Sequence, residues 1–174
     1  LDKKCKGYYG HDFDLECAVN SGKAQVYWTK NGERLDPELV GEGKKYQIVK
    51  ELSGFLKMTV NDCQKDDEAT YACCLEKQPD KTETVISLSE FQYKFTKILK
   101  SARLIEKDTL TLACELNDAR GDVKWLKNGE ELQSDKRLEI IKDGRKRKLI
   151  IRDAKVSDSG EFSCVSNADK TNAE

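Results

Sequence analysis

A cysteine and a tryptophan recur at one spacing in both halves of this 174-residue chain. Trp28 follows Cys17 by eleven positions, and Trp125 follows Cys114 by the same eleven. The two copies lie 97 positions apart, which is too long for one unit of a solenoid but suits a small domain. The repeat therefore predicts two copies of one domain.

Short segments of alternating apolar and polar residues fill each copy. Phe13, Leu15 and Cys17 alternate in the first, and Leu110 with Leu112 begins the same pattern in the second. Such alternation buries one face of a β-strand and exposes the other. Asn-Gly and Asp-Gly turn signals separate the segments, and no helical pattern stands out. We expect an all-β fold of two tandem β-sandwiches.

The domain boundary is expected between residues 1–90 and residues 91–174. No stretch rich in proline, glycine or serine lies there, so the linker is expected to be very short. Aligned on the cysteines, the first copy lacks the beginning of its first strand and the second lacks the end of its last strand. The chain is therefore expected to be a piece of a longer protein.

The Cys–Trp pair is followed in each copy by an aromatic residue and a second cysteine. This pattern resembles the immunoglobulin fold, in which a tryptophan packs over two facing cysteines and a tyrosine hydroxyl ties one turn. The core signature that the resemblance implies is Cys17, Trp28, Tyr71, Cys73, Cys114, Trp125, Phe162 and Cys164. Because Phe162 replaces the tyrosine, that hydroxyl bond, worth about 1 kcal/mol, is expected only in the first domain.

The resemblance also implies a pairing for the signature cysteines, Cys17 with Cys73 and Cys114 with Cys164. These pairs are either disulfides or reduced thiols that fill the core. The seven cysteines are an odd number, and the chain has no Asn-x-Ser/Thr glycosylation site. Both features favour reduced thiols and a cytoplasmic setting.

A further resemblance is carried by the Trp-x-Lys-Asn-Gly-Glu sequences and by residues 144–160, GRKRKLIIRDAKVSDSG. They are similar to intermediate-set domains of giant sarcomeric proteins, most like titin, with obscurin, twitchin and myosin-binding protein C as relatives. The resemblance implies a segment of the sarcomere that bears force and docks other sarcomeric or signalling proteins and its neighbouring domains. It also implies two ion pairs, Asp67 with Lys45 and Asp158 with Arg137, each expected at the surface and worth about 0–1 kcal/mol.

Two other functions stay open at this point. An extracellular adhesion or receptor module would carry oxidised cysteine pairs and ordinarily glycosylation. A regulatory pair of domains flanking a kinase would look the same in this segment.

Composition and motifs disfavour other classes. With 31 basic and 32 acidic residues the net charge is −1, which argues against binding to nucleic acid or to an anionic membrane. His11 is the single histidine and is expected in a solvated loop, and no phosphate loop, nucleotide fingerprint or nucleophile motif appears. We expect no catalytic residues, no cofactor and no metal site.

Two surface features remain as candidates. The basic run over the turn at Gly144 is either a solvated hairpin tip or a patch that docks an acidic protein, and its members are Lys142, Arg145, Lys146, Arg147 and Lys148. Cys74 directly follows Cys73 and should face outward, as a possible exposed thiol.

Overall fold

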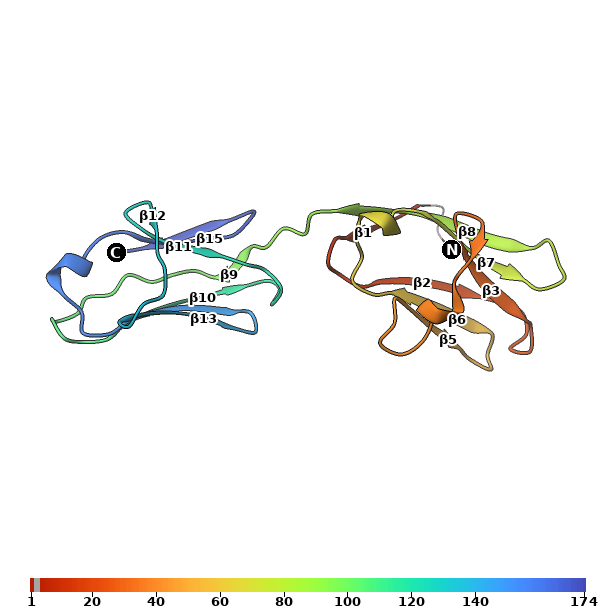
Figure 1. Cartoon of the computed structure of the whole chain (residues 1–174), viewed down its shortest axis with the longest axis horizontal. Helices are drawn as coiled ribbons and strands as arrows, with labels where there is room; N and C mark the ends of the chain where they lie inside the picture. Colours follow the sequence, from red (N-terminus) through yellow and green to blue (C-terminus); the bar gives the residue numbers. More distant parts are fainter. Residues whose placement is uncertain (2–3) are drawn as a thin grey trace. The chain divides into compact units, whose positions relative to one another are not determined.

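The computed structural model describes residues 1 and 4–174 and divides into two compact units, Leu1–Phe91 and Gln92–Glu174. Each unit is a sandwich of two β-sheets, which Figure 1 shows one above the other. This confirms the fold class expected from the alternation and the repeat. Helical structure in the described residues is limited to turns of three residues, η1 (Pro37–Leu39), η2 (Lys65–Asp67) and η3 (Val156–Asp158). None of them is long or apolar enough to cross a membrane.

The first unit contains a larger and a smaller sheet. The larger one has the strand order β1-β8-β7-β3-β4, and the smaller one has the order β2-β6-β5. The strands are β1 (Lys4–Tyr8), β2 (Phe13–Ala18), β3 (Val26–Lys30), β4 (Glu33–Arg34), β5 (Tyr46–Lys50), β6 (Phe55–Val60), β7 (Thr70–Leu75) and β8 (Lys81–Ser89).

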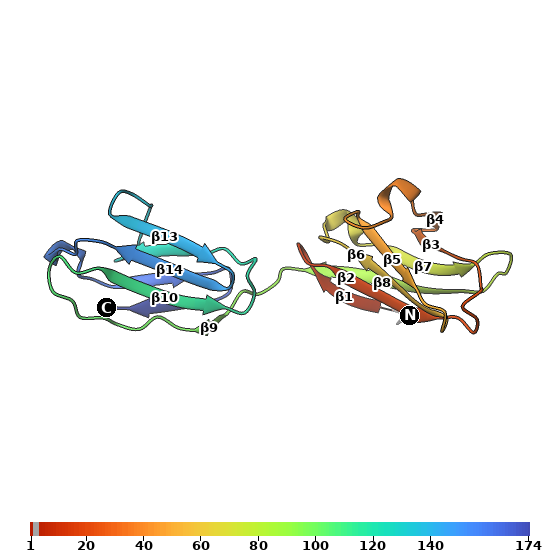
Figure 2. The same cartoon turned by 90° about the horizontal axis from the view of Figure 1, so that it is seen from below.

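The second unit has two sheets of four strands within the described residues. Their orders are β13-β14-β10-β9 and β12-β11-β15-β16, and Figure 2 shows the first of these sheets in face view. The strands are β9 (Phe95–Lys97), β10 (Leu110–Leu116), β11 (Lys124–Lys127), β12 (Glu130–Glu131), β13 (Leu138–Asp143), β14 (Lys146–Ile151), β15 (Phe162–Val165) and β16 (Lys170–Ala173).

Asn-Gly pairs make the same tight turn in both units. Asn31 and Gly32 join β3 to β4 and have φ angles of 52° and 85°. Asn128 and Gly129 join β11 to β12 with φ angles of 50° and 88°. A two-residue hairpin turn with both φ angles positive follows the twist of its strands, and asparagine and glycine tolerate those angles best. The sequence therefore sets these hairpins locally.

The core of each unit lies between its sheets and includes the expected tryptophan. Trp28 is 3% exposed and sits opposite Cys73 on the neighbouring strand. Trp125 is 1% exposed and sits opposite Cys164. Leucine and isoleucine side chains complete each cluster, and Met58 and Val60 join them in the first unit.

The prediction that the Tyr71 hydroxyl makes a hydrogen bond is wrong. Its side chain is fully buried, and its hydroxyl has no hydrogen-bond partner among the described residues. Its ring meets that of Tyr46 edge-on, with centroids 6.4 Å apart. Burial, with the neighbouring Tyr46, raises the pKa of the Tyr71 hydroxyl. At this corner the tyrosine of the first unit acts as an aromatic filler, as Phe162 does in the second.

Candidate functional sites

The basic run forms the β13–β14 hairpin, but only part of it is available at the surface. Arg145 and Lys146 are exposed at the tip. Lys142 is exposed as well, but its ammonium pairs with Asp122 at 2.7 Å. Lys148 is half-buried. The exposed positive charge at this tip is therefore carried by two side chains, those of Arg145 and Lys146.

Arg147 does not belong to the surface patch, contrary to expectation. Its side chain is 2% exposed, because it stands opposite Cys114 in the ladder and faces inward with Leu149 and Ile151. Strand alternation decides this orientation, since successive side chains point to opposite faces. The alternation of Arg147 with the apolar residues after it is the sequence signal that could have shown this.

Both terminal nitrogens of the Arg147 guanidinium donate to main-chain carbonyls, whereas its buried Nε has no partner among the described residues. One terminal nitrogen donates to Gly144 at 2.7 Å and Lys146 at 2.9 Å, and the other donates to Ala119 at 2.9 Å and to Gly121. A buried charge costs several kcal/mol unless charge-assisted hydrogen bonds compensate it. These bonds tie the loop between β10 and β11 to the β13–β14 hairpin, so Arg147 is a structural clamp.

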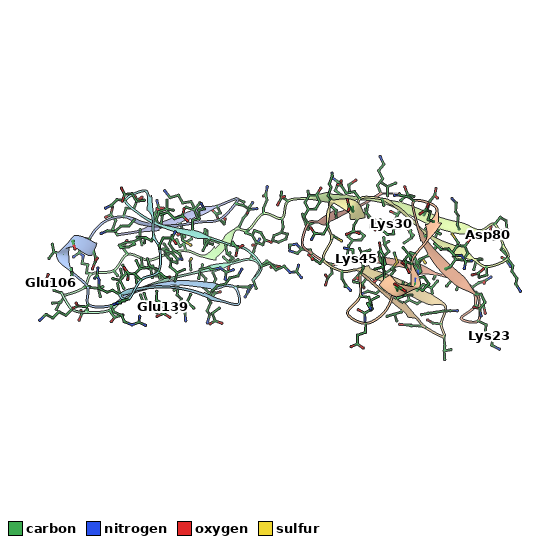
Figure 3. All side chains as sticks on the ribbon, in the orientation of Figure 1. Lys23, Lys30, Lys45, Asp80, Glu106 and Glu139 are labelled. Carbon is green, nitrogen blue, oxygen red and sulfur yellow. The ribbon has the colours of Figure 1, made fainter. Side chains whose placement is uncertain are left out.

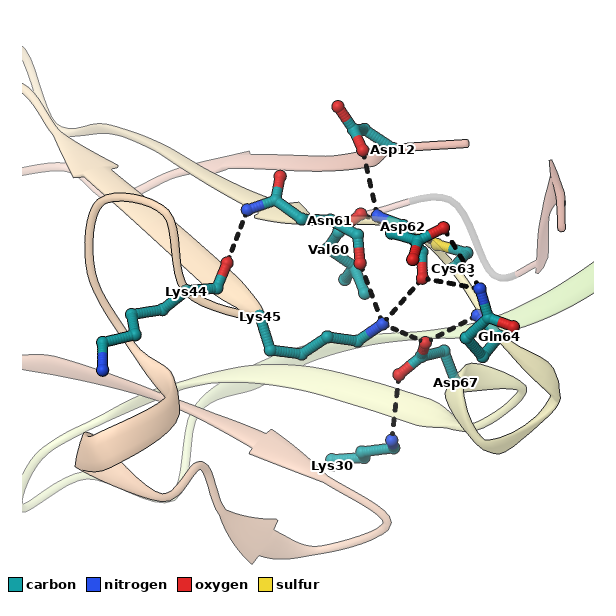
Figure 4. A network of polar contacts seen from close by, with 10 residues as sticks. All are labelled: Asp12, Lys30, Lys44, Lys45, Val60, Asn61, Asp62, Cys63, Gln64 and Asp67. Carbon is teal, nitrogen blue, oxygen red and sulfur yellow. Dashed lines mark hydrogen bonds and ion pairs between the residues drawn. The ribbon is translucent and has the colours of Figure 1, made fainter. Parts of the chain in front are cut away.

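Asp67 in the η2 turn is the centre of a buried polar network (Figure 4). Its carboxylate is 3% exposed and meets the ammonium of Lys30 at 3.2 Å and that of Lys45 at 2.5 Å. The backbone N–H of Gln64 donates to the same carboxylate at 2.9 Å. Figure 3 shows both lysines within the first unit. The expected partner Lys45 is confirmed, and Lys30 is a second partner that sequence reasoning missed.

The environment of Asp67 keeps it charged. Burial by itself would raise the pKa of this carboxyl, but the Gln64 N–H and the two ammonium groups lower it below its ordinary value of 3.8. Lys45 also donates to the carbonyls of Asn61 at 2.8 Å and Asp62 at 3.0 Å. The expectation of a weak exposed pair is wrong here, because the carboxylate is buried and has three donors.

The corresponding turn of the second unit holds the expected pair of Asp158 and Arg137. The guanidinium donates two parallel bonds of 2.6 and 2.9 Å, and the backbone N–H of Lys155 donates a third at 2.8 Å. Arg137 lowers the pKa of Asp158 from 3.8 to about 2 despite partial burial. Bidentate geometry makes this pair stronger than an ordinary surface pair.

The first and last strands of the first unit run side by side in the same direction. β1 and β8 are parallel and pair over five positions, from Lys4 opposite Val85 to Tyr8 opposite Ser89. Gly7 pairs with Leu88 in this ladder, and a Cβ there would lie 2.8 Å from the Phe13 ring and 3.0 Å from the Leu88 side chain, so glycine leaves room for both. This ladder links the two ends of the unit.

His11 is packed rather than solvated, contrary to expectation. Its ring stacks on Phe91 with centroids 4.5 Å apart and meets Tyr8 edge-on at 6.0 Å. Its Nδ1 lies 3.1 Å from the carbonyl oxygen of Tyr9. Among the described residues no group of three histidine, cysteine or acidic side chains could hold a metal ion.

The seven cysteines are free thiols in this structure. Cys17 and Cys73 are within hydrogen-bond reach of each other, and so are Cys114 and Cys164. The hydrogen bond with its partner, together with burial, raises the pKa of Cys73, and the same holds for Cys164. In each pair the same hydrogen bond lowers the pKa of the other thiol, Cys17 or Cys114.

The three remaining cysteines differ in their burial. Cys63 is fully buried, which raises its pKa to about 11. Cys5 is half-buried and accepts from the hydroxyl of Thr84 at 3.4 Å. Cys74 is half-buried on β7, opposite Tyr27. Cys74 as a possible exposed thiol stays a prediction.

Comparison with known proteins shows where this architecture recurs. The family model described as "Immunoglobulin I-set domain" matches residues 2–89 and 93–174. Titin of Drosophila melanogaster is 32% identical over 151 residues, which are 86% of this chain and 1% of titin. Cardiac-type myosin-binding protein C of Mus musculus is 29% identical over 167 residues, 95% of this chain and 13% of the relative. The chain thus spans a small fraction of the curated relatives that it matches.

Among solved structures, the I9–I11 tandem of titin matches with a TM-score of 0.53 and 22% identity. The match covers 98% of this chain and 61% of the titin fragment. At this identity the likeness shows the fold alone.

Proposed function

The chain belongs to the immunoglobulin I-set family, and from this membership and its strand geometry we propose that it is a load-bearing segment of a muscle filament. Its relatives include muscle proteins, so a structural role in the sarcomere is the general setting. The proposal assigns two tasks to the chain, the transmission of force and the docking of another protein. Neither task requires catalysis, and we propose a non-enzymatic protein.

The parallel β1–β8 ladder carries the mechanical part of the proposal. Its five residue pairs join the strand that enters the first unit to the strand that leaves it. Force applied along the chain pulls these strands in opposite directions along their length. Their hydrogen bonds are then loaded together rather than broken one after another. The ladder is therefore the element that resists extension of the first unit.

Single-molecule pulling of the whole chain tests this role with one residue. The N–H of Cys5 in β1 faces β8, because successive N–H groups of a strand point to opposite sides and the N–H of Tyr9 donates to Ser89. Cys5→Pro therefore removes an N–H of the ladder and fixes φ. Cys5→Ala, which keeps the N–H, is the matched control. We expect a lower unfolding force for the first unit in Cys5→Pro than in Cys5→Ala. Equal unfolding forces in the two variants would show that the β1–β8 ladder does not resist extension.

The docking part of the proposal rests on the exposed hairpin tip, Arg145 and Lys146. Exposed cations of this kind accelerate association with an acidic partner and select for it. The name of the myosin-binding relative suggests myosin as the first partner to test. Co-sedimentation with myosin filaments should weaken by about tenfold, or about 1.4 kcal/mol, when both residues are changed to Glu. The same change at Lys23 and Lys44, exposed on the first unit, is the control.

The sarcomeric location is testable in tissue. Antibody against this segment should label striated muscle in bands, and movement of the bands with stretch would indicate an extensible region. Staining confined to the cell surface or matrix would instead favour the extracellular adhesion module.

A further inference from the structure

The smaller sheet of the first unit ends at an open edge on β5. Among the described residues β6 is the only strand that pairs with β5 (Figure 1). The N–H of Glu51 donates to the carbonyl of Phe55 across this antiparallel ladder at 2.9 Å. Such bonds recur at every second residue of a strand, so the intervening residues Ile48 and Lys50 direct their N–H and C=O groups away from β6.

The chain itself begins a further strand on this edge and then leaves it. Val40 forms a parallel bridge with Tyr46, and the N–H of Gly41 donates to the carbonyl of Tyr46 at 2.8 Å. Gly41, with a φ angle of 142°, lies where the chain turns away. Beyond this bridge, the N–H and C=O groups of Ile48 and Lys50 have no hydrogen-bond partner among the described residues.

The corresponding edge of the second unit, on β13, is covered by its own loop. The N–H of Leu138 donates to the Asp135 carboxylate at 2.6 Å, and its carbonyl accepts from the N–H of Asp135 at 2.8 Å. The N–H of Ile140 donates to the hydroxyl of Ser134 at 3.2 Å. An open edge is a template for pairing with another chain, and many proteins cover it with a loop of this kind. The edge of β5 lacks this cover beyond Tyr46.

Exposed apolar side chains accompany the open edge. Ile48 is half-buried and packs against the core, so its neighbour Val49 faces the other side of the sheet, where it is 45% exposed. Leu52, in the turn that follows β5, is 97% exposed. Apolar groups beside unpaired main chain mark a surface that a strand with apolar side chains covers.

We propose that β5 is an acceptor edge to which an extended apolar strand of a partner protein adds. The strand continues along the line that Val40 begins, parallel to β5, and its main chain bonds to Ile48 and Lys50. One of its side chains packs beside Ile48 on the inner face, and the next packs beside Val49 on the outer face. The partner therefore presents consecutive apolar residues in an extended segment, and this site is separate from the basic hairpin tip of the second unit.

Amide hydrogen exchange of the 174-residue chain, followed by NMR, tests the site residue by residue. The probe is a synthetic peptide of sequence ETVIVTE, titrated to about 5 mM so that a Kd of about 1 mM is still detected. At about five times its Kd the peptide should slow exchange at Ile48 and Lys50 about sixfold, because only unbound molecules exchange there. The amides of Leu138 and Ile140, which are already bonded, should not respond. A peptide in which serine replaces the three apolar residues should have no effect.

Lys50→Pro and Lys50→Ala form the matched pair of variants. Proline removes the outward N–H of residue 50 and leaves the bonds to β6, which lie at the neighbouring residues, whereas alanine keeps that N–H. Protection of Ile48 by the peptide should be lost in Lys50→Pro and persist in Lys50→Ala. Val49→Asp leaves the main chain unchanged and should raise the Kd by about tenfold, because it places a charge against an apolar side chain of the peptide.

Three results would each overturn the proposal: no slowing at Ile48 and Lys50 with the apolar peptide, equal slowing with the serine peptide, or equal protection in Lys50→Pro and Lys50→Ala. Slowing that grows with the concentration of the chain alone would assign the edge to a second copy of the chain and would overturn it as well.

Discussion

Replacing Asp67 by asparagine should destabilise the first domain by about 3 kcal/mol. The carboxylate is 3% exposed and is bound by two ammonium groups and one backbone N–H. Removing one member of a buried ion pair usually costs about 3–5 kcal/mol, because the remaining charge is left without a partner. Lys30 and Lys45 are each 25% exposed and can regain some hydration, which places the loss at the lower end of that range.

Urea unfolding followed by the fluorescence of Trp28, in a Trp125→Phe background, measures this loss in the first domain alone. Asp66→Asn is the matched control, because Asp66 is adjacent, exposed and in the same turn. It should change the free energy of unfolding by less than about 0.5 kcal/mol. Lys45→Met, alone and combined with Asp67→Asn, completes a double-mutant cycle, in which we expect a coupling energy of at least about 1 kcal/mol.

The pH dependence gives an independent check on Asp67. Its folded-state pKa lies below the ordinary value of 3.8, so its contribution is fully present above about pH 5. That contribution is lost as the pH falls through the folded-state pKa. The difference between the wild type and Asp67→Asn should therefore be constant near neutrality and shrink in acid. A difference below about 1 kcal/mol at pH 7, or an equal effect of Asp66→Asn, would refute the reasoning.

Three further predictions concern single positions. Asp158→Asn should destabilise the second domain by about 1–2 kcal/mol at pH 7. The difference in unfolding free energy between the wild type and this variant should disappear between about pH 5 and 2, as the carboxylate bound by Arg137 is protonated. Urea unfolding followed by Trp125 fluorescence at several pH values measures it. Tyr71→Phe should change the stability of the first domain by less than about 0.5 kcal/mol in urea unfolding, because its hydroxyl makes no hydrogen bond with the described residues; a loss above 1 kcal/mol would contradict this. Arg147→Leu should destabilise the second domain by about 2–3 kcal/mol in the same assay, since the carbonyls that it binds lose their donor, and a neutral result would show that water replaces it.

The two-domain β-sandwich was predictable because its determinants are local and occur twice. Alternation over five or six residues decides which face of a strand is buried, as in β2 and β10. The Asn-Gly pairs at 31–32 and 128–129 decide where two hairpins turn, because few other residues adopt both positive φ angles. The repeated spacing from Cys17 to Trp28 then indicates one fold used twice.

The sites were only partly predictable, because they depend on contacts between distant segments. A basic run suggested that Arg147 was at the surface, but its position in the ladder directs it inward to carbonyls of another loop. The partner Lys45 followed from the family pattern, whereas Lys30 reaches Asp67 from a strand 37 residues earlier in the chain. The burial that turns a weak surface pair into a strong one is likewise a property of the folded sandwich.

The sequence by itself determined the fold, the repeat and the core residues, since periodicity and turn chemistry act over a few neighbouring positions. Only the tertiary structure decided which charges are buried and which distant strands pair. The parallel ladder of β1 with β8 joins Lys4 to Val85, 81 positions later in the chain. No local pattern encodes such pairings, because they depend on how the two layers close over one core.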